Sequence, residues 1–310
     1  MKIVVAGGTG LVGSALVSEF QSIGHEVISA STKNVDFLNR SATIDFIVDA
    51  APEVVIDAAA RVGGIGANNS FPVEFFINNV NIQNNLMEAS YFAKVKKFIF
   101  LGSSCIYPRN SVQPIKEDYL LTGHLEKTNS AYAIAKIAGI ELVNSYRKEY
   151  GKSWISLMPT NLYGPRDNFA VEGSHVLPAL IRKFVDAERD NSKTVELWGD
   201  GSPLREFLHV EDVARAVVLA SREYDDVIHL NIGSGDEISI KDLALMIAEL
   251  SGFKGEILWD MGRPNGTPRK VLDSSRMRSL GWTPKISLKD GVRSTIDWYR
   301  EAVASGVARL

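Results

Sequence analysis

Gly7-Gly8-Thr9-Gly10-Leu11-Val12-Gly13 follows a β-branched run, residues 2–6, and opens a segment with helical periodicity, residues 10–23. Glycines let the backbone turn sharply and approach a pyrophosphate closely, and the free N–H groups at the start of a helix bind its negative charge. A Gly-rich turn can also be purely structural, but its place at the first strand-to-helix junction favours dinucleotide binding. The stretch therefore predicts a nucleotide-binding βα unit.

The rest of the first half repeats this alternation of short strands and longer helices. The predicted strands are residues 2–6, 26–30, 53–58, 97–101 and 153–158, and the predicted helices are residues 10–23, 41–49, 72–93 and 132–150. Strands that alternate with helices form right-handed βαβ units, which assemble into a parallel sheet with helices on both faces. The fold class is therefore α/β, a doubly wound parallel sheet of the Rossmann type.

The second half is less regular and predicts a smaller lobe. Its predicted strands are residues 194–198 and 227–232, and its predicted helices are residues 176–187, 210–221, 240–250 and 289–303. We expect residues 1–165, with interleaved later strands, to form the dinucleotide-binding domain. Residues 166–310 are expected to form mainly an α/β lobe for the substrate.

The composition is that of a globular chain and argues against several classes. The 310 residues carry 34 Lys and Arg against 37 Asp and Glu, and a net charge of −3 argues against nucleic acid as a partner. The lone Cys105 excludes an intramolecular disulfide, and the five His show no metal-site spacing. No apolar run has the length of a membrane span, and the early glycines do not suit a secretory signal. We therefore expect a cytoplasmic protein without a metal.

The end of the second predicted strand bears on the choice of cofactor. Folds that select NAD place an acidic residue there, which binds the ribose 2′-hydroxyl. This chain instead reads Ser29-Ala30-Ser31-Thr32-Lys33. Two hydroxyls and a Lys suit a 2′-phosphate, although a surface Lys is often merely solvated. NADP(H) is therefore predicted in preference to NAD.

A Tyr and a Lys four residues apart lie at the start of the predicted helix 132–150. The spacing places Tyr132 and Lys136 on one helical face, where the ammonium is expected to lower the pKa of the phenol. Asn129 and Ser130 are candidates to cap this helix. The preceding strand ends in Gly102-Ser103-Ser104-Cys105, which offers a hydroxyl that could polarise a carbonyl. The Tyr-Lys pair alone is weak evidence, and its position near such a hydroxyl strengthens it.

Together with the glycine loop, these features resemble the extended short-chain dehydrogenase/reductase family. The resemblance implies a catalytic triad of Ser103, Tyr132 and Lys136. Further blocks resemble, within that family, the GDP-L-fucose synthases, from the first strand to about residue 298. These blocks are residues 59–65, 102–108, 132–139, 159–165, 174–180 and 205–210.

By this likeness Cys105 and His175 are the base and the acid of an epimerase. Taken alone, a single Cys is most often a small buried side chain, and a His is often a satisfied imidazole. Cys105 lies just beyond a strand end and two residues after Ser103, which favours a place in the cleft. A thiol can also be tuned into a base that removes a proton next to a ketone.

The resemblance also implies which residues bind the cofactor and the nucleotide sugar. Cofactor contacts are expected from Gly7, Thr9, Gly10, Leu11, Val12, Gly13, Thr32, Lys33, Leu101, Gly102, Lys136, Pro159, Thr160, Asn161, Leu162 and His175. Substrate contacts are expected from Asn161, Lys183, Trp198, Arg205 and Lys270. Arg205 suits a diphosphate, whereas Lys270 could also belong to a solvated basic loop. The chain departs from the family in having Thr9 where many members have Arg, and Arg166 where His is common. The first departure moves any 2′-phosphate contact towards Thr32 and Lys33.

The activity implied is the NADPH-dependent conversion of GDP-4-keto-6-deoxy-D-mannose to GDP-L-fucose, by epimerisation at C3 and C5 and reduction at C4. The nearest alternative is GDP-L-colitose synthesis, which inverts only C5 of a 3-deoxy sugar. A nucleotide-sugar 4-epimerase or 4,6-dehydratase is less favoured, because dehydratases of this kind have an Asp-Glu pair where this chain has Ser104-Cys105. A cofactor-sensing regulator would not need the triad, Cys105 and His175 together. The resemblance also implies a homodimer, formed through residues 72–93 and 132–150.

Overall fold

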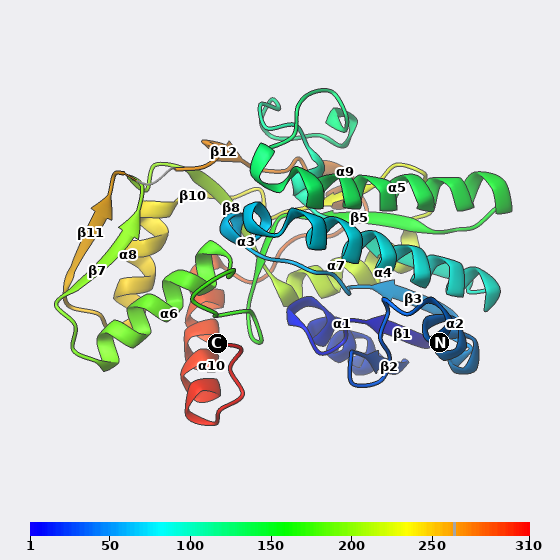
Figure 1. Ribbon diagram of the computed structural model, residues 1–310, viewed down its shortest axis with the longest axis horizontal. Coiled ribbons are helices and arrows are strands. Elements are labelled where there is room, and N and C mark those ends of the chain that lie inside the picture. Colours follow the sequence, from blue (N-terminus) through cyan, green and yellow to red (C-terminus); the bar gives the residue numbers. More distant parts are fainter. Residues whose placement is uncertain (263–264) are drawn as a thin grey trace.

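A six-stranded parallel sheet, called the central sheet below, lies in the right-hand part of the molecule in Figure 1. The computed structural model describes residues 1–262 and 265–310. The strands lie in the order β2-β1-β3-β4-β5-β9, and each pairs in parallel with its neighbours. Their bounds are β1 Lys2–Ala6, β2 Glu26–Ala30, β3 Val54–Asp57, β4 Lys97–Leu101, β5 Ile155–Pro159 and β9 Leu230–Ile232. The predicted doubly wound sheet is confirmed.

Helices cover both faces of this sheet because successive strand residues point to opposite sides. Val4 and Ala6 belong to the core on the side of α2, α4 and α5, whereas Ile3 and Val5 belong to the core on the side of α1 and α7. The bounds are α1 Leu11–Ser22, α2 Arg40–Ala50, α4 Pro72–Phe92, α5 Ser130–Tyr150 and α7 Val210–Glu223. Hydrophobic burial on both faces fixes the strand register, since a slip by one residue would exchange the two cores.

The remaining chain builds smaller sheets beside the central one. One has the order β10-β8-β12, with β6 also paired to β8, and the other pairs β11 with β7. The strand bounds are β6 Asn161–Tyr163, β7 Thr194–Trp198, β8 Leu204–His209, β10 Glu237–Ser239, β11 Glu256–Asp260 and β12 Arg269–Lys270. Because β9 returns to the central sheet after β7 and β8, the two parts of the chain interleave.

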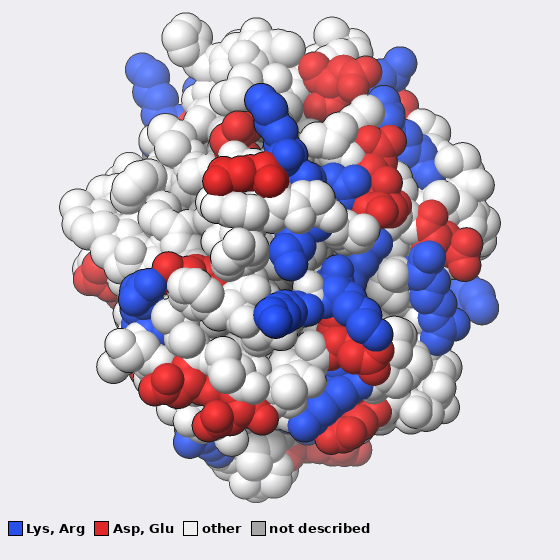
Figure 2. All heavy atoms as spheres, turned by 90° about the vertical axis from the view of Figure 1, so that its right-hand side faces the viewer, with Lys and Arg blue, Asp and Glu red and all other residues white. Residues whose placement is uncertain are grey.

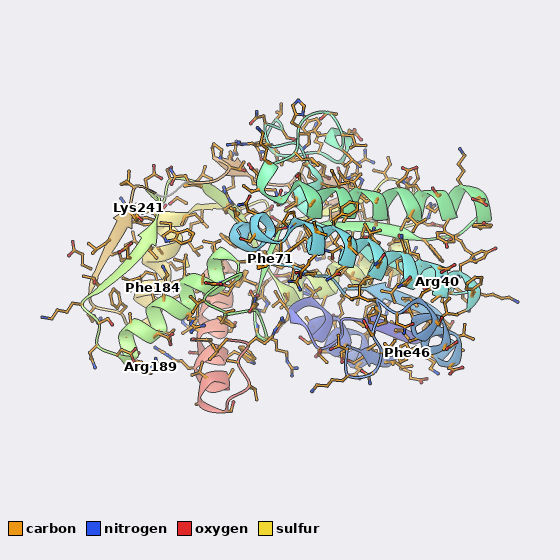
Figure 3. The ribbon with its side chains drawn as sticks, in the orientation of Figure 1. Arg40, Phe46, Phe71, Phe184, Arg189 and Lys241 are labelled. Atoms are coloured by element: carbon orange, nitrogen blue, oxygen red, sulfur yellow. The ribbon has the colours of Figure 1, made fainter. Side chains whose placement is uncertain are left out.

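Three helices build a third core against the smaller sheets. They are α6 Val176–Arg189, α8 Ile240–Ser251 and α10 Leu288–Ala304. Phe184 of α6, labelled in Figure 3, is fully buried, and its ring lies 5.5 Å from that of Phe253. The short elements are α3 Ile65–Ser70, α9 Ser275–Ser279 and the 3-10 turns η1 Ser104–Ile106, η2 Glu117–Tyr119 and η3 Lys127–Asn129.

The carboxyl ends of the central strands meet at one edge of the sheet. The segments that follow β1 and β3 touch there, since a Cβ added to Gly7 would lie 2.6 Å from the carbonyl oxygen of Ala58. Those that follow β4 and β5 are joined by a 2.8 Å hydrogen bond from the Gly102 N–H to the Leu157 carbonyl. Open α/β sheets bind their ligands at this edge.

Acidic and basic side chains intermingle on the face shown in Figure 2, which is the right-hand side of Figure 1. That face therefore carries no continuous field of one sign. Within residues 1–262 and 265–310, no helix is both long enough and apolar enough to cross a bilayer.

Candidate active site

The glycine loop leaves room for an anion at the start of α1. Gly7 adopts a φ of +77°, in the left-handed region. A Cβ on Gly13 would lie 2.1 Å from the Gly7 carbonyl oxygen, so α1 packs directly against the loop. Gly10 caps α1 without any side-chain hydrogen bond, and the first turn holds no acidic residue. The free N–H groups and the positive end of the helix dipole therefore suit the binding of a pyrophosphate.

The turn after β2 presents hydroxyl and ammonium groups next to this loop. Asn34 Oδ1 accepts hydrogen bonds from the N–H and the hydroxyl of Ser31, and Ser31 Oγ accepts one from the N–H of Lys33. Thr32 and Lys33 are exposed. The next carboxylate along the chain, Asp36, accepts a hydrogen bond from the N–H of Leu38. The turn therefore keeps the cationic character that a 2′-phosphate requires.

Ser103 and Tyr132 meet beyond the end of β4. A hydrogen bond links their hydroxyls, and Ser103 Oγ also accepts the N–H of Cys105 at 3.2 Å. Tyr132 is 9% exposed, and its ring packs edge-on against Phe75. Burial raises the pKa of Tyr132 well above its ordinary value, while the Ser103 hydroxyl acts in the opposite direction. The phenol is therefore held protonated at neutral pH.

This result corrects the expectation that Lys136 lowers the pKa of Tyr132. Both side chains are buried on one face of α5, as their spacing predicts. The Lys136 ammonium, however, donates to the Leu101 carbonyl at 2.9 Å and lies 4.8 Å from the centre of the Phe100 ring. Burial lowers the pKa of Lys136, and the nearby carboxylate of Asp57 counteracts this shift. The Lys136 ammonium is directed to the end of β4 and not to the phenol. Desolvation therefore outweighs the charge of Lys136 in setting the pKa of Tyr132.

Asp57 is a buried acid that the sequence interpretation missed. It ends β3 and is 1% exposed, its Oδ1 accepts the N–H of Ala59, and its Oδ2 has no protein partner among the described residues. Burial raises the pKa of Asp57 to about 6, against the opposing effect of Lys136. A charged residue directly after the apolar run Val54-Val55-Ile56 was the available signal, because isolated carboxylates are rarely buried without a purpose.

Cys105 lies in η1 and receives two hydrogen bonds from residues distant in sequence. Asn129 Nδ2 donates to its sulfur at 3.3 Å, and Lys270 Nζ at 3.7 Å. Asn129 is the residue at the N-cap of α5, but its side chain makes no capping hydrogen bond. The Ser130 hydroxyl donates instead to the Lys127 carbonyl. The expectation that one of these two side chains caps α5 is therefore wrong.

His175 is positioned by a glycine contact between two loops. It is the N-cap of α6, and the segment before it packs on the loop after β3. The Gly64 N–H donates to the Gly173 carbonyl at 2.9 Å, and a Cβ on Gly64 would lie 2.5 Å from the Ser174 carbonyl oxygen. His175 as a whole residue is exposed, and desolvation by the protein around its imidazole lowers the pKa of His175. An exposed residue with a desolvated imidazole is the arrangement expected in a cleft.

Arg205 and Lys270 form a cationic pair on neighbouring strands. They are paired residues of β8 and β12. Burial lowers the pKa of Arg205, and no carboxylate among residues 1–262 and 265–310 is recorded as its partner. A Cβ on Gly266 would lie 3.5 Å from Arg205 Nη2. A partly desolvated guanidinium without a counter-ion is suited to hold a phosphate.

The other predicted substrate and cofactor residues have distinct places. Lys183 Nζ donates to the Glu196 carbonyl of β7, the strand that ends in the 62% exposed Trp198. Asn161 Nδ2 donates to the Glu206 carbonyl at 2.9 Å and so fixes the strand that carries Arg205. Thr160 lies beside it and is buried. Lys183 of α6 thus contacts the strand that carries Trp198.

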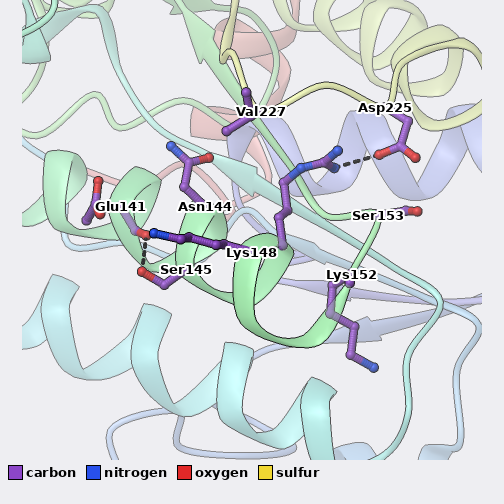
Figure 4. Close-up of a pocket in the computed structure, with 10 residues that line it drawn as sticks. Glu141, Asn144, Ser145, Lys148, Lys152, Ser153, Asp225 and Val227 are labelled. Carbon is purple, nitrogen blue, oxygen red and sulfur yellow. Dashed lines mark hydrogen bonds and ion pairs between the residues drawn. The ribbon is translucent and has the colours of Figure 1, made fainter.

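Two surface cavities of the molecule lie away from this site. The first, of about 620 Å³, lies at the end of α5 around the Arg147–Asp225 ion pair (Figure 4). The second, of about 700 Å³, is lined by residues 108–112 and parts of 119–127. Neither is lined by a predicted site residue, so the functional site is located by its chemistry.

Comparisons of sequence and of structure with known proteins point to the same family. Residues 3–233 match the model of the "NAD dependent epimerase/dehydratase family". A putative GDP-L-fucose synthase 2 of Arabidopsis thaliana is 52% identical over 303 residues, covering 97% of this chain and 92% of that protein. A solved GDP-L-fucose synthetase of Naegleria fowleri bound to NADP is 30% identical, with a TM-score of 0.91, covering 100% of this chain and 96% of that one. The GDP-L-colitose synthase of Yersinia pseudotuberculosis is 34% identical, covering 96% and 98%.

Proposed function

Because this chain belongs to the NAD dependent epimerase/dehydratase family, and within it to the GDP-L-fucose synthases, we propose that it converts GDP-4-keto-6-deoxy-D-mannose to GDP-L-fucose with NADPH. The observation that carries the proposal is the position of Cys105 beside the hydrogen-bonded Ser103 and Tyr132. A reductase needs only the two hydroxyls and Lys136. The additional thiol provides the base for epimerisation, which an assay with this ketosugar tests by product stereochemistry.

The epimerisation steps use the acidity of carbons next to a ketone. The 4-keto group acidifies the protons at C3 and C5, so the Cys105 thiolate removes one and leaves an enolate. The hydroxyls of Ser103 and Tyr132 donate hydrogen bonds to the enolate oxygen. His175 then protonates the opposite face of the carbon, which inverts it. The Cys105 thiol then releases its proton to solvent and His175 takes one up, and repetition at the second carbon completes the epimerisation.

The reduction step depends on the protonated phenol. Bound NADPH supplies the hydride that C4 receives. Tyr132, kept protonated by burial, gives its proton to the C4 oxygen. Lys136 holds the end of β4 through the Leu101 carbonyl and keeps positive charge near the developing alkoxide. The protein contributes orientation and proton transfer here.

The cofactor is predicted to be NADPH because Thr32 and Lys33 replace the usual acid. Lys33→Asp should weaken NADPH binding by about 1 to 3 kcal/mol, through loss of a charge-assisted contact and added repulsion, and should spare NADH. Fluorescence titration of both cofactors on the parent and the variant measures this. An equal loss for the two cofactors would remove Lys33 from the 2′-phosphate site.

The role of His175 predicts a pH dependence. The donor form is the imidazolium, and the lowered pKa of His175 leaves most rings neutral at pH 7. Where proton delivery is limiting, net inversion should therefore accelerate as the pH falls from about 8 to 6. His175→Gln should lose inversion and this pH dependence while retaining proton removal, followed as deuterium uptake without change of configuration. Parent-like inversion by the variant would exclude His175 as the donor.

The nucleotide sugar is proposed to lie across the smaller sheets. Arg205 would bind the diphosphate, because it is a partly desolvated guanidinium without a recorded carboxylate partner. Trp198 offers an exposed ring to a base or sugar, and Lys183 of α6 donates a hydrogen bond to the strand that carries Trp198. GDP-L-colitose synthesis is the second candidate, favoured by the same scaffold and disfavoured by the lower identity of 34%. Its 3-deoxy substrate would show no inversion at C3.

We also propose a cytoplasmic homodimer. The single Cys105 is needed as a free thiol, which suits a reducing compartment. Helices α4 and α5 pack together and leave apolar side chains exposed, namely Val73, Phe76, Ile77 and Ile134. Such a surface is typical of helix pairs that meet a second copy. Light scattering should give twice the chain mass of 34.0 kDa, and a monomer would contradict the dimer.

A further inference from the structure

We propose that Asn129 and Lys270 are positioning residues that hold the Cys105 sulfur as an aimed thiolate; this rests on the proposed role of Cys105 as the base. Both donate to the same sulfur, at 3.3 Å and 3.7 Å. A thiolate accepts such hydrogen bonds more strongly than a thiol, because charge-assisted hydrogen bonds are roughly twice as strong as neutral ones. The two contacts therefore favour the reactive form and fix its direction.

The helix start shows that Asn129 has a use other than capping. Asn is among the best N-cap residues, and a side-chain cap stabilises the helix. Asn129 occupies the N-cap of α5, with φ −129° and ψ 17°, yet makes no capping hydrogen bond. Its amide nitrogen donates to the sulfur, and its buried Oδ1 has no protein partner within the described residues. The side chain gives up the cap and is directed to Cys105.

Lys270 is held near the sulfur because its strand is anchored to residues that are distant in the sequence. Its strand β12 pairs with β8, opposite Arg205. The next residues are anchored, since the Val271 N–H donates to Gln113 Oε1 and the Leu272 N–H donates to the buried Glu206 carboxylate. No carboxylate of the described part of the chain is recorded within ion-pair distance of Lys270. The ammonium is thus free to face the sulfur.

This arrangement changes the expectation for Lys270. The sequence leaves open a contact to the nucleotide sugar or a solvated basic loop. In the structure the Lys270 ammonium contacts the sulfur, while the backbone of Lys270 pairs with that of Arg205 on the neighbouring strand. A cation beside the sulfur stabilises the thiolate. We therefore assign Lys270 the role of positioning the Cys105 sulfur, and the experiments below test this role separately from nucleotide binding.

The single cysteine makes a direct test possible without substrate or cofactor. Alkylation by iodoacetamide reports on Cys105 alone, and its rate is followed from pH 5 to 10 in the complete chain. Asn129→Asp keeps the size of the side chain but places a carboxylate beside the sulfur, and Lys270→Met removes the ammonium. Each should move the midpoint of the alkylation profile up by about one pH unit, which is about tenfold slower alkylation at neutral pH.

Three further variants separate positioning from structure. Asn129→Ser keeps the capping preference and loses the amide donor, so its thermal unfolding should match the parent while alkylation slows. Lys270→Arg should restore most of the parent profile. Lys148→Met removes an exposed Lys at the far end of α5 and should change nothing.

Kinetics with the ketosugar distinguish this proposal from nucleotide binding. Lys270→Met should lower kcat for deuterium exchange with little change in KM. A raised KM with a parent-like alkylation profile would overturn the role and return Lys270 to the substrate site. Parent-like profiles for both Asn129→Asp and Lys270→Met would overturn the whole proposal. If Cys105→Ser still exchanges fully, the proposed function of the thiol fails, whereas shifted alkylation profiles would still establish the contacts.

Discussion

Tyr132→Phe should slow hydride transfer to C4 by about 100-fold or more, the scale on which a lost general acid acts. The variant keeps the ring, which packs on Phe75, and removes only the hydroxyl that is bonded to Ser103. Desolvation holds the parent phenol protonated, so the lost group is the proton donor for the C4 oxygen. Single-turnover loss of NADPH absorbance measures the step.

Two controls keep this result interpretable. NADPH affinity should be unchanged, because the glycine loop and the turn at Lys33 are untouched. Deuterium exchange at C3 and C5 should fall less than reduction, since the Ser103 hydroxyl still faces the enolate oxygen. Near-parent NADPH oxidation by Tyr132→Phe would exclude Tyr132 as the donor.

Cys105→Ser should abolish epimerisation while leaving a slow reduction. A Ser hydroxyl is too weakly acidic to act as an effective base, whereas Tyr132 and Lys136 stay in place. The backbone N–H at position 105 still donates to Ser103 Oγ, so the loop geometry should persist. The variant should lose deuterium uptake at C3 and C5, and should form a GDP-6-deoxyhexose of the starting configuration.

The products of this variant separate the two halves of the mechanism. Nuclear magnetic resonance of the recovered sugar shows both the configuration and the deuterium content. GDP-L-fucose formed at the parent rate, with full deuterium at both carbons, would mean that the thiol only packs. A complete loss of reduction as well would show that Cys105 also supports Ser103 and Tyr132.

The central sheet was predictable because strands that are buried on both faces consist of nearly continuous apolar residues. Strands such as Lys97–Leu101 are short apolar runs, and the intervening helices have regular spacing. The shared face of Tyr132 and Lys136 was predictable for the same reason, since a separation of four residues is a local property of a helix. The glycine loop was also a local signal.

The electrostatics of the site could not be predicted from local spacing. The pKa of Tyr132 depends on how deeply the phenol is buried, and the direction of Lys136 depends on the Leu101 carbonyl of another element. The contact between Lys270 and Cys105 joins residues 165 positions apart. The prediction that Asn129 caps α5 was wrong because its side chain can either cap the helix or bind a residue elsewhere in the fold, and here it binds the Cys105 sulfur. Only the assembled fold decides between them.

The most direct test of the account is incubation of the complete chain with GDP-4-keto-6-deoxy-D-mannose and NADPH in deuterated water. The account predicts NADPH oxidation and a GDP-L-fucose product that carries solvent deuterium at both C3 and C5. Absorbance gives the first result, and nuclear magnetic resonance of the product gives the second. No NADPH oxidation, or a reduced product that keeps the starting configuration at C3 and C5, would contradict it.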